Sequence, residues 1–85
     1  MSEHRADIYA AIDAERDRQI RKWGGKHDWG TGDCSSLDVH NIVKVSVLSE
    51  ECGEVARAVL DLDNTQLRTE LIQVAAVAVA WLEAL

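Results

Sequence analysis

Hydrophobic residues recur every three or four positions along three stretches of the chain, the spacing that places them on one face of an α-helix. The first stretch covers residues 3–23, and its recurring positions are Ile8, Ile12, Ile20 and Trp23. Charged residues fill the positions between them, as on the solvent face of an amphipathic helix. Gly24 and Gly25 follow, and two glycines let the chain leave a helix at little conformational cost. The pattern therefore predicts a first helix over residues 3–23.

A second helix is predicted to start at Ser35 or Ser36 and to end near Leu60. Either serine is a good N-cap, and Asp38 would then lie in the first turn, where a negative charge is favourable. The apolar positions form a helical stripe that comprises Leu37, Ile42, Val45, Leu48, Cys52, Val55, Val59 and Leu62. We expect this stripe to form a buried seam.

The third stretch predicts a helix over residues 65–84, after a turn at residues 61–64. Asp63, with Gln66 three residues later, has the spacing of a capping box at a helix start. Hydrophobic residues surround this helix almost completely, a pattern typical of a buried helix. Glu70 and Gln73 interrupt that apolar surface one turn apart. Because a buried carboxylate must find a partner or become neutral, we expect Glu70 to meet a group from another element.

The length and composition favour one all-α domain of three main helices. An 85-residue chain has no room for a second domain, so residues 1–85 are expected to fold as one unit. Proline, the strongest helix breaker, is absent. A chain this short has a thin core, and three helices cannot enclose so apolar a third helix alone. We therefore expect a homodimer or a homotetramer. The longest uncharged run, residues 71–82, is too short to span a bilayer, so no membrane association is expected.

The segment between the first two predicted helices is a candidate ligand-binding loop. It is long for so small a domain, and long loops are often functional. Trp23 could stack on a base, and Lys26 and His27 could contact a phosphate. The segment lacks the spacing of a phosphate-binding P-loop, and no strand precedes it. Ordinary packing of a tryptophan at a helix end is the alternative.

The net charge limits which molecules this protein is expected to bind, and the N-terminal residues and the cysteines indicate its cellular compartment. A net charge of −6 disfavours binding to a nucleic acid polymer. Five of the nine basic residues nevertheless lie within residues 16–26, and one or two of them are candidates to face an anionic ligand. The first residues lack the apolar segment of a signal peptide, so we expect a cytoplasmic protein with reduced Cys34 and Cys52. A zinc site formed by Cys34, His27 and His40 is conceivable, but no metal-binding spacing supports it.

Three carboxylates, Glu50, Glu51 and Glu54, lie within five positions of the second predicted helix. Two carboxylates 5 Å apart repel each other by about 3 kcal/mol at an effective dielectric constant near 20. A divalent cation would offset this repulsion, whereas a solvated acidic face screened by Arg57 is the alternative. Gly53 supports the cation site, because a glycine inside a helix lowers the stability of the helix by about 1 kcal/mol relative to alanine. Such a glycine suggests the close approach of another backbone or of a ligand.

A short connection requires the last two helices to pack antiparallel, which brings this acidic cluster to the third helix. Glu51 and Glu54 would then face Glu70 and Gln73 across the seam. Three carboxylates and an amide oxygen form a set of hard ligands suited to Mg²⁺, with Mn²⁺ as the alternative. The sequence thus predicts a metal site at Glu51, Glu54, Glu70 and Gln73.

Residues 49–56 (SEECGEVA), followed by residues 70–77 (ELIQVAAV), resemble the EExxE…ExxD signature of the MazG-like all-α nucleoside triphosphate pyrophosphohydrolases. The chain is most similar to the short phage and prophage members, and the resemblance extends over residues 15–19 (ERDRQ) and 22–24 (KWG). It implies an oligomeric fold of the four-helix-bundle type. It also implies Mg²⁺-dependent hydrolysis of a nucleoside triphosphate to the monophosphate and pyrophosphate.

The resemblance also assigns roles to single residues. Glu51, Glu54 and Glu70 match the family's metal ligands, and Glu51 therefore belongs to the catalytic centre. Glu50 matches the leading glutamate, which positions or deprotonates the attacking water. Gln73 stands where the family has aspartate, so it would supply an oxygen ligand without charge. This departure keeps a second interpretation open, in which the chain is a catalytically weak or inactive module that binds a nucleotide or a protein.

Overall fold

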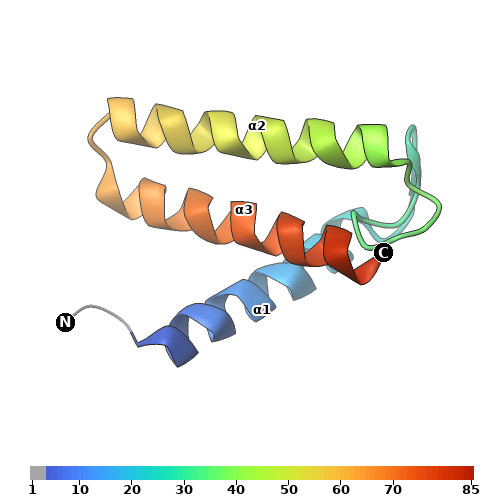
Figure 1. Ribbon diagram of the computed structural model, residues 1–85, viewed down its shortest axis with the longest axis horizontal. Helices are drawn as coiled ribbons and strands as arrows, with labels where there is room; N and C mark the ends of the chain where they lie inside the picture. Colours follow the sequence, from blue (N-terminus) through green and yellow to red (C-terminus); the bar gives the residue numbers. More distant parts are fainter. Residues whose placement is uncertain (1–3) are drawn as a thin grey trace.

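The computed structural model describes residues 4–85 and contains three helices, which confirms the predicted number and order. They are α1 (Arg5–Trp23), α2 (Asn41–Leu60) and α3 (Asn64–Glu83). Figure 1 shows α2 and α3 side by side and antiparallel, with α1 crossing α3 obliquely on the side away from α2. The predicted first helical residue, Glu3, lies outside the described residues, and α1 begins at Arg5. Helix α3 therefore separates the other two helices and contacts both.

The loop between α1 and α2 contains a short hairpin that the hydrophobic pattern did not predict. Strand β1 (Lys26–His27) pairs antiparallel with strand β2 (Gly30–Thr31). Gly30 has a φ of 128°, and a side chain there would clash with the backbone oxygen of Asp38 at 2.6 Å. This position therefore requires glycine.

The predicted start of the second helix at Ser35 or Ser36 is wrong, because α2 begins at Asn41. Of the two serines expected to cap it, Ser35 donates to the Asp33 carboxylate, and Ser36 binds the hairpin together with Asp38. The Ser36 hydroxyl donates to the Thr31 carbonyl at 2.6 Å, and the Asp38 carboxylate accepts from the Thr31 N–H at 2.7 Å.

The N-cap of α2 is His40, whose Nδ1 accepts from the Ile42 N–H at 3.0 Å. The cap of α3 follows the prediction more closely, since the Asp63 carboxylate accepts from the Gln66 N–H at 2.9 Å. The Gln66 side chain does not complete a capping box, because its Nε2 donates to Glu70.

The apolar core is small and lies along α3. Its fully buried hydrophobic residues are Val39, Ala58, Ala76, Val77 and Ala80. Alanines at these positions let α2 and α3 pack closely, and Trp81 of α3 donates to the Asn41 side chain at the start of α2. Few large side chains are enclosed, as expected for a chain of this length.

The hydrophobic stripe predicted for the second helix is only partly buried. Leu48 and Val55 are half-buried, but Ile42 is 66% exposed and Val59 is 52% exposed. The buried and half-buried residues of α2 also include Val43, Lys44, Val47, Glu51 and Ala58. The exposure of Ile42 and Val59 differs from the prediction, because the buried side of α2 is turned toward Lys44 and toward Glu51, which was expected only at its edge.

Buried charges attach the loop to the helices. Arg16 of α1 is only 4% exposed and donates to Asp33 in the loop at 2.5 Å and to Glu83 of α3 at 2.8 Å. Lys44 of α2 is also buried, and its ammonium group donates to the Ser36 carbonyl at 2.8 Å. Within residues 4–85, no helix combines the length and the apolar character that crossing a membrane requires.

Candidate metal centre

Three glutamates from two helices converge between α2 and α3. Glu51 and Glu54 lie one turn apart on α2, and Glu70 lies on the antiparallel α3. One carboxylate oxygen of each lies within 4.8 Å of the others. Glu70 is buried, Glu51 is half-buried and Glu54 is exposed, so the cluster opens to solvent on one side. The pairing of helices expected from the sequence therefore brings these three carboxylates together.

Gln73 lies against the cluster, one turn after Glu70. In the amide orientation that satisfies both of its polar groups, its nitrogen donates to Glu70 Oε2 and to Glu51 Oε2, each at 3.0 Å. The predicted role of the Gln73 amide oxygen as a metal ligand stays a prediction. In the absence of a cation, two carboxylates attract the donor end of the amide. Rotation of the amide by half a turn would point its oxygen toward the carboxylate cluster instead, where it could bind a cation.

The crowding of carboxylates changes their proton affinity. Burial, followed by the charges of Glu54 and Glu70, raises the pKa of Glu51 to about 7. A hydrogen bond to Glu70 is the main cause that raises the pKa of Glu54. Both shifts favour the protonated forms of these carboxyl groups, through burial for Glu51 and through the hydrogen bond for Glu54. A perturbed cluster of this kind is a candidate functional site.

Helix α1 contributes two charged groups beside the cluster that the sequence analysis had not assigned to it. The charge of Glu15 contributes to the raised pKa of Glu51, and the charge of Glu51 in turn acts on Arg18. Glu15 and Arg18 form a bidentate ion pair, with distances of 2.8 and 2.7 Å. The sequence offered two general signs, the family resemblance over residues 15–19 and the concentration of basic residues within residues 16–26, and neither assigned Glu15 or Arg18 to the carboxylates.

The donor set fits a hard divalent cation. Carboxylate oxygens are the ligands that Mg²⁺ and Mn²⁺ prefer, and positive charge would replace the repulsion with attraction. Among residues 4–85, this is the one group of three or more His, Cys, Asp or Glu side chains close enough to share an ion. The zinc site considered from the sequence is not formed by those residues, since His40 Nδ1 caps α2 and His27 Nε2 contacts the Gly32 carbonyl.

The predicted catalytic residue Glu50 is exposed on α2, directly before Glu51. Its charge is among those that raise the pKa of Glu51, which places it near the cluster without making it part of the cluster. A solvent-exposed carboxylate beside a metal site is free to meet a water molecule or a substrate.

The predicted substrate-binding residues lie at the hairpin end of the molecule. Trp23 and His27 pack edge to face with ring centres 5.8 Å apart, and Lys26 is exposed on β1. Both ring nitrogens of His27 are used within the loop, at Gly32 and Trp29. Glu51 lies ten residues into α2, about 15 Å along its axis from the hairpin end. Within one chain, these residues and the carboxylates are therefore separate groups.

Comparison with known proteins adds no relative: no family model, curated protein or solved structure matches the chain. The function must therefore be argued from the carboxylate cluster and its surroundings.

Proposed function

We propose that this chain is a MazG-like nucleoside triphosphate pyrophosphohydrolase that uses Mg²⁺ or Mn²⁺ and releases a nucleoside monophosphate and pyrophosphate. The observation that carries the proposal is the convergence of Glu51, Glu54 and Glu70 within 4.8 Å. Each of these residues belongs to one of the two acidic motifs on which the family resemblance rests. The two motifs are separated in sequence, and their convergence supports a shared site.

In the proposed reaction, Glu51, Glu54 and Glu70 would hold the divalent cation. A bound divalent cation neutralises charge on phosphate oxygens and lowers the pKa of water. Glu50 is exposed beside this site and would accept a proton from the attacking water. The water oxygen bonds to the α-phosphorus, the bond from that phosphorus to the bridging oxygen breaks, and pyrophosphate leaves.

The proposed active form is a homodimer or a homotetramer whose helices pack as a four-helix bundle. Exposed apolar side chains on both α2 and α3 support this assembly, among them Ile42, Val59, Leu71 and Leu82. A monomer would leave these side chains in water, and pairing would remove them from it. Trp23 and Lys26 are exposed and stay candidates for contacts to the base and the phosphates.

A second candidate function is a helical module that binds a nucleotide or a protein without turnover. Gln73 favours it, because its amide nitrogen donates to two of the three carboxylates and stabilises the cluster without any metal. Such a stabilised cluster needs no cation to fold. The two candidates differ in whether phosphate bonds are broken.

A panel of nucleoside triphosphates incubated with and without Mg²⁺ tests the proposal directly. We expect release of monophosphate and pyrophosphate in a 1:1 ratio, dependent on the metal and lost in Glu51→Gln. Asp17→Asn is a matched control, because Asp17 is exposed on α1 and outside the metal cluster. Absence of turnover with every nucleotide would favour the binding module.

A further inference from the structure

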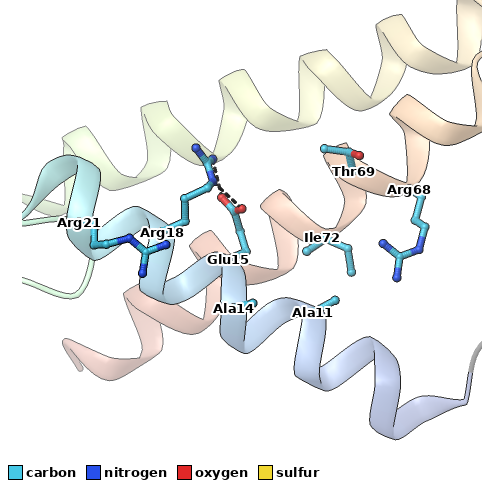
Figure 2. A pocket seen from close by; sticks show the side chains of 8 residues that line it. All are labelled: Ala11, Ala14, Glu15, Arg18, Arg21, Arg68, Thr69 and Ile72. Atoms are coloured by element: carbon cyan, nitrogen blue, oxygen red, sulfur yellow. Dashed lines mark hydrogen bonds and ion pairs between the residues drawn. The ribbon is translucent and has the colours of Figure 1, made fainter.

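A basic pocket lies between α1 and α3, on the side of α3 away from α2. It has a volume of about 330 Å³, which is within the range of small-molecule sites. Figure 2 shows Arg18 and Arg21 reaching it from α1 and Arg68 from α3. These are three of the nine basic residues in a chain of net charge −6. Such a concentration of guanidinium groups marks this pocket as a site for an anion.

The chemistry of the lining favours phosphate. Guanidinium groups bind phosphate oxygens through paired N–H donors, and Arg is the usual residue for this purpose. Arg18 uses its Nε and one Nη2 hydrogen for Glu15, and its other donors are not used in that pair.

The arrangement of the arginines favours a chain of phosphates over a single one. In Figure 2, Arg21 and Arg68 lie at opposite ends of the pocket, with Arg18 and Glu15 between them. A polyphosphate chain is itself elongated and carries charge along its length.

The pocket adjoins the carboxylate cluster. On α3, the pocket residues Thr69 and Ile72 directly precede the cluster residues Glu70 and Gln73, so the two sites occupy neighbouring faces of one helix. On α1, Glu15 lines the pocket and also acts electrostatically on Glu51. A ligand long enough to pass from one of these faces of α3 to the next would contact both sites.

We propose that this pocket binds the phosphate chain of the nucleotide, with Arg18, Arg21 and Arg68 as its charged contacts. The identity of the ligand as a nucleotide rests on the proposed function, whereas the binding of a polyphosphate does not. The arginines would hold one part of the phosphate chain, and a cation held by the carboxylates would neutralise charge on another part.

Binding of sodium tripolyphosphate, measured by calorimetry with EDTA present, tests the pocket apart from any metal. We expect Arg21→Gln and Arg68→Gln each to weaken this binding about tenfold, the effect of losing one charge-assisted contact. Both side chains are exposed, so the variants should fold. Arg57→Gln is the matched control, since Arg57 is an exposed arginine of α2 that pairs with Asp61. Orthophosphate should bind more weakly than tripolyphosphate.

The proposal is overturned if tripolyphosphate does not bind without metal, if orthophosphate binds equally well, or if Arg57→Gln causes the same loss. Nucleotide hydrolysis with Mg²⁺ is measured in parallel. Turnover with an unchanged KM in Arg21→Gln and Arg68→Gln would reject the pocket and leave the proposed function standing. Arginine-dependent tripolyphosphate binding without any turnover would support the pocket and reject the hydrolase.

Discussion

The amide nitrogen of Gln73 on α3 lies 3.0 Å from Glu51 Oε2 on α2. This hydrogen bond joins the two helices at the centre of the carboxylate cluster. It also helps to hold Glu70 beside Glu51, because the same nitrogen donates to Glu70, as does the Gln66 side chain. Gln73, the residue that departs from the family pattern, thus contributes to the stability of the cluster without metal.

Gln73→Asp should make the cluster less stable without metal and more stable with it. The substitution removes a donor and adds a fourth negative charge, so the protein should melt at a lower temperature in EDTA. The added charge should also tighten Mg²⁺ binding, and about 1.4 kcal/mol would correspond to a tenfold change in affinity. Thermal melting across a Mg²⁺ titration measures both effects. Gln73→Asn is the control, because asparagine has the same length as aspartate and carries no charge. If both variants have the same melting temperature and the same affinity for Mg²⁺, the added charge is not the cause.

Glu51→Gln and Glu70→Gln should both weaken Mg²⁺ binding, because each removes one charged ligand from the cluster. Glu50→Gln should behave differently. Since Glu50 is exposed and outside the cluster, this variant should keep its affinity for Mg²⁺ and lose nucleotide hydrolysis. Calorimetry with Mg²⁺ and an activity assay on the same samples separate the two roles. Unchanged metal binding in both Glu51→Gln and Glu70→Gln would mean that the metal binds elsewhere.

The stability of the metal-free protein should fall as the pH rises between about 4.5 and about 7. The pKa of Glu51 is raised from 4.5 to about 7, first by burial and then by neighbouring carboxylates. The folded state therefore binds more protons than the unfolded state in this window, and it loses that advantage as Glu51 ionises. Chemical denaturation at several pH values in EDTA measures the effect.

Mg²⁺ binding should show the opposite pH dependence. A carboxylate must lose its proton before it coordinates a cation, so the affinity should rise with pH and level off above about 7. Glu51→Gln should flatten both pH profiles, whereas Asp17→Asn should leave them unchanged. A pH-independent affinity in the parent protein would show that Glu51 is not a ligand.

The helices and the convergence of the three glutamates were predictable because both follow from periodicity. Helical spacing identified three helices, and a short connection required α2 and α3 to be antiparallel. The carboxylates then had to meet at matching heights along the two helices. The orientation of the Gln73 amide was not predictable, because it depends on which atoms surround it.

The loop and the start of α2 were mispredicted for a different reason. Ser36 and Asp38 have the chemistry of helix caps, but they bind the hairpin at Thr31, a contact set by tertiary structure. Arg16 and Lys44 look like ordinary surface charges in the sequence, yet both are buried. Local propensity cannot identify such positions, since only distant partners make burial of a charge acceptable.

Arg16→Met should destabilise the fold strongly. Arg16 contacts Asp33 and Glu83 from a position that is 4% exposed. Removal of one partner from a buried ion pair leaves a buried charge, at a cost of about 3 kcal/mol or more. Urea denaturation measures the loss. Arg57→Met is the control, because its exposed pair with Asp61 should contribute less than about 1 kcal/mol. Equal losses of unfolding free energy in both variants would show that the burial of the Arg16 ion pairs adds nothing to the stability of the fold.

An acidic solution should weaken the same network. Burial alone would raise the pKa of Asp33, but hydrogen bonds from Ser35 and Arg16 lower it below its ordinary value. A lowered carboxyl pKa gives stability that is present above the unfolded pKa and is lost as the pH falls through the folded one. Asp33→Asn should therefore reduce the acid dependence of unfolding. If this variant loses stability at low pH as steeply as the parent protein does, Asp33 is not the group responsible.

The exposed stripe of α2 should hold two copies of the chain together. Val45, Cys52 and Val59 are spaced seven residues apart, and Ile42, Ser49 and Ala56 repeat the same interval, which is the heptad spacing of paired helices. Gly53 lies beside this stripe, and nothing within 4 Å would meet a side chain there, so a partner helix could approach closely. Light scattering at micromolar concentration should give the mass of a dimer or a tetramer.

Val45→Asp together with Val59→Asp should lower the measured mass, because two charges would be buried unpaired in the helix pair. Thr65→Asp is the control, since Thr65 is exposed in the first turn of α3 and lies outside the stripe of α2. If the double variant keeps the parent's mass, the chains associate through another face, and the exposed residues of α3, Leu71 and Leu82, become the next to test. A monomeric parent would reject the oligomeric form altogether.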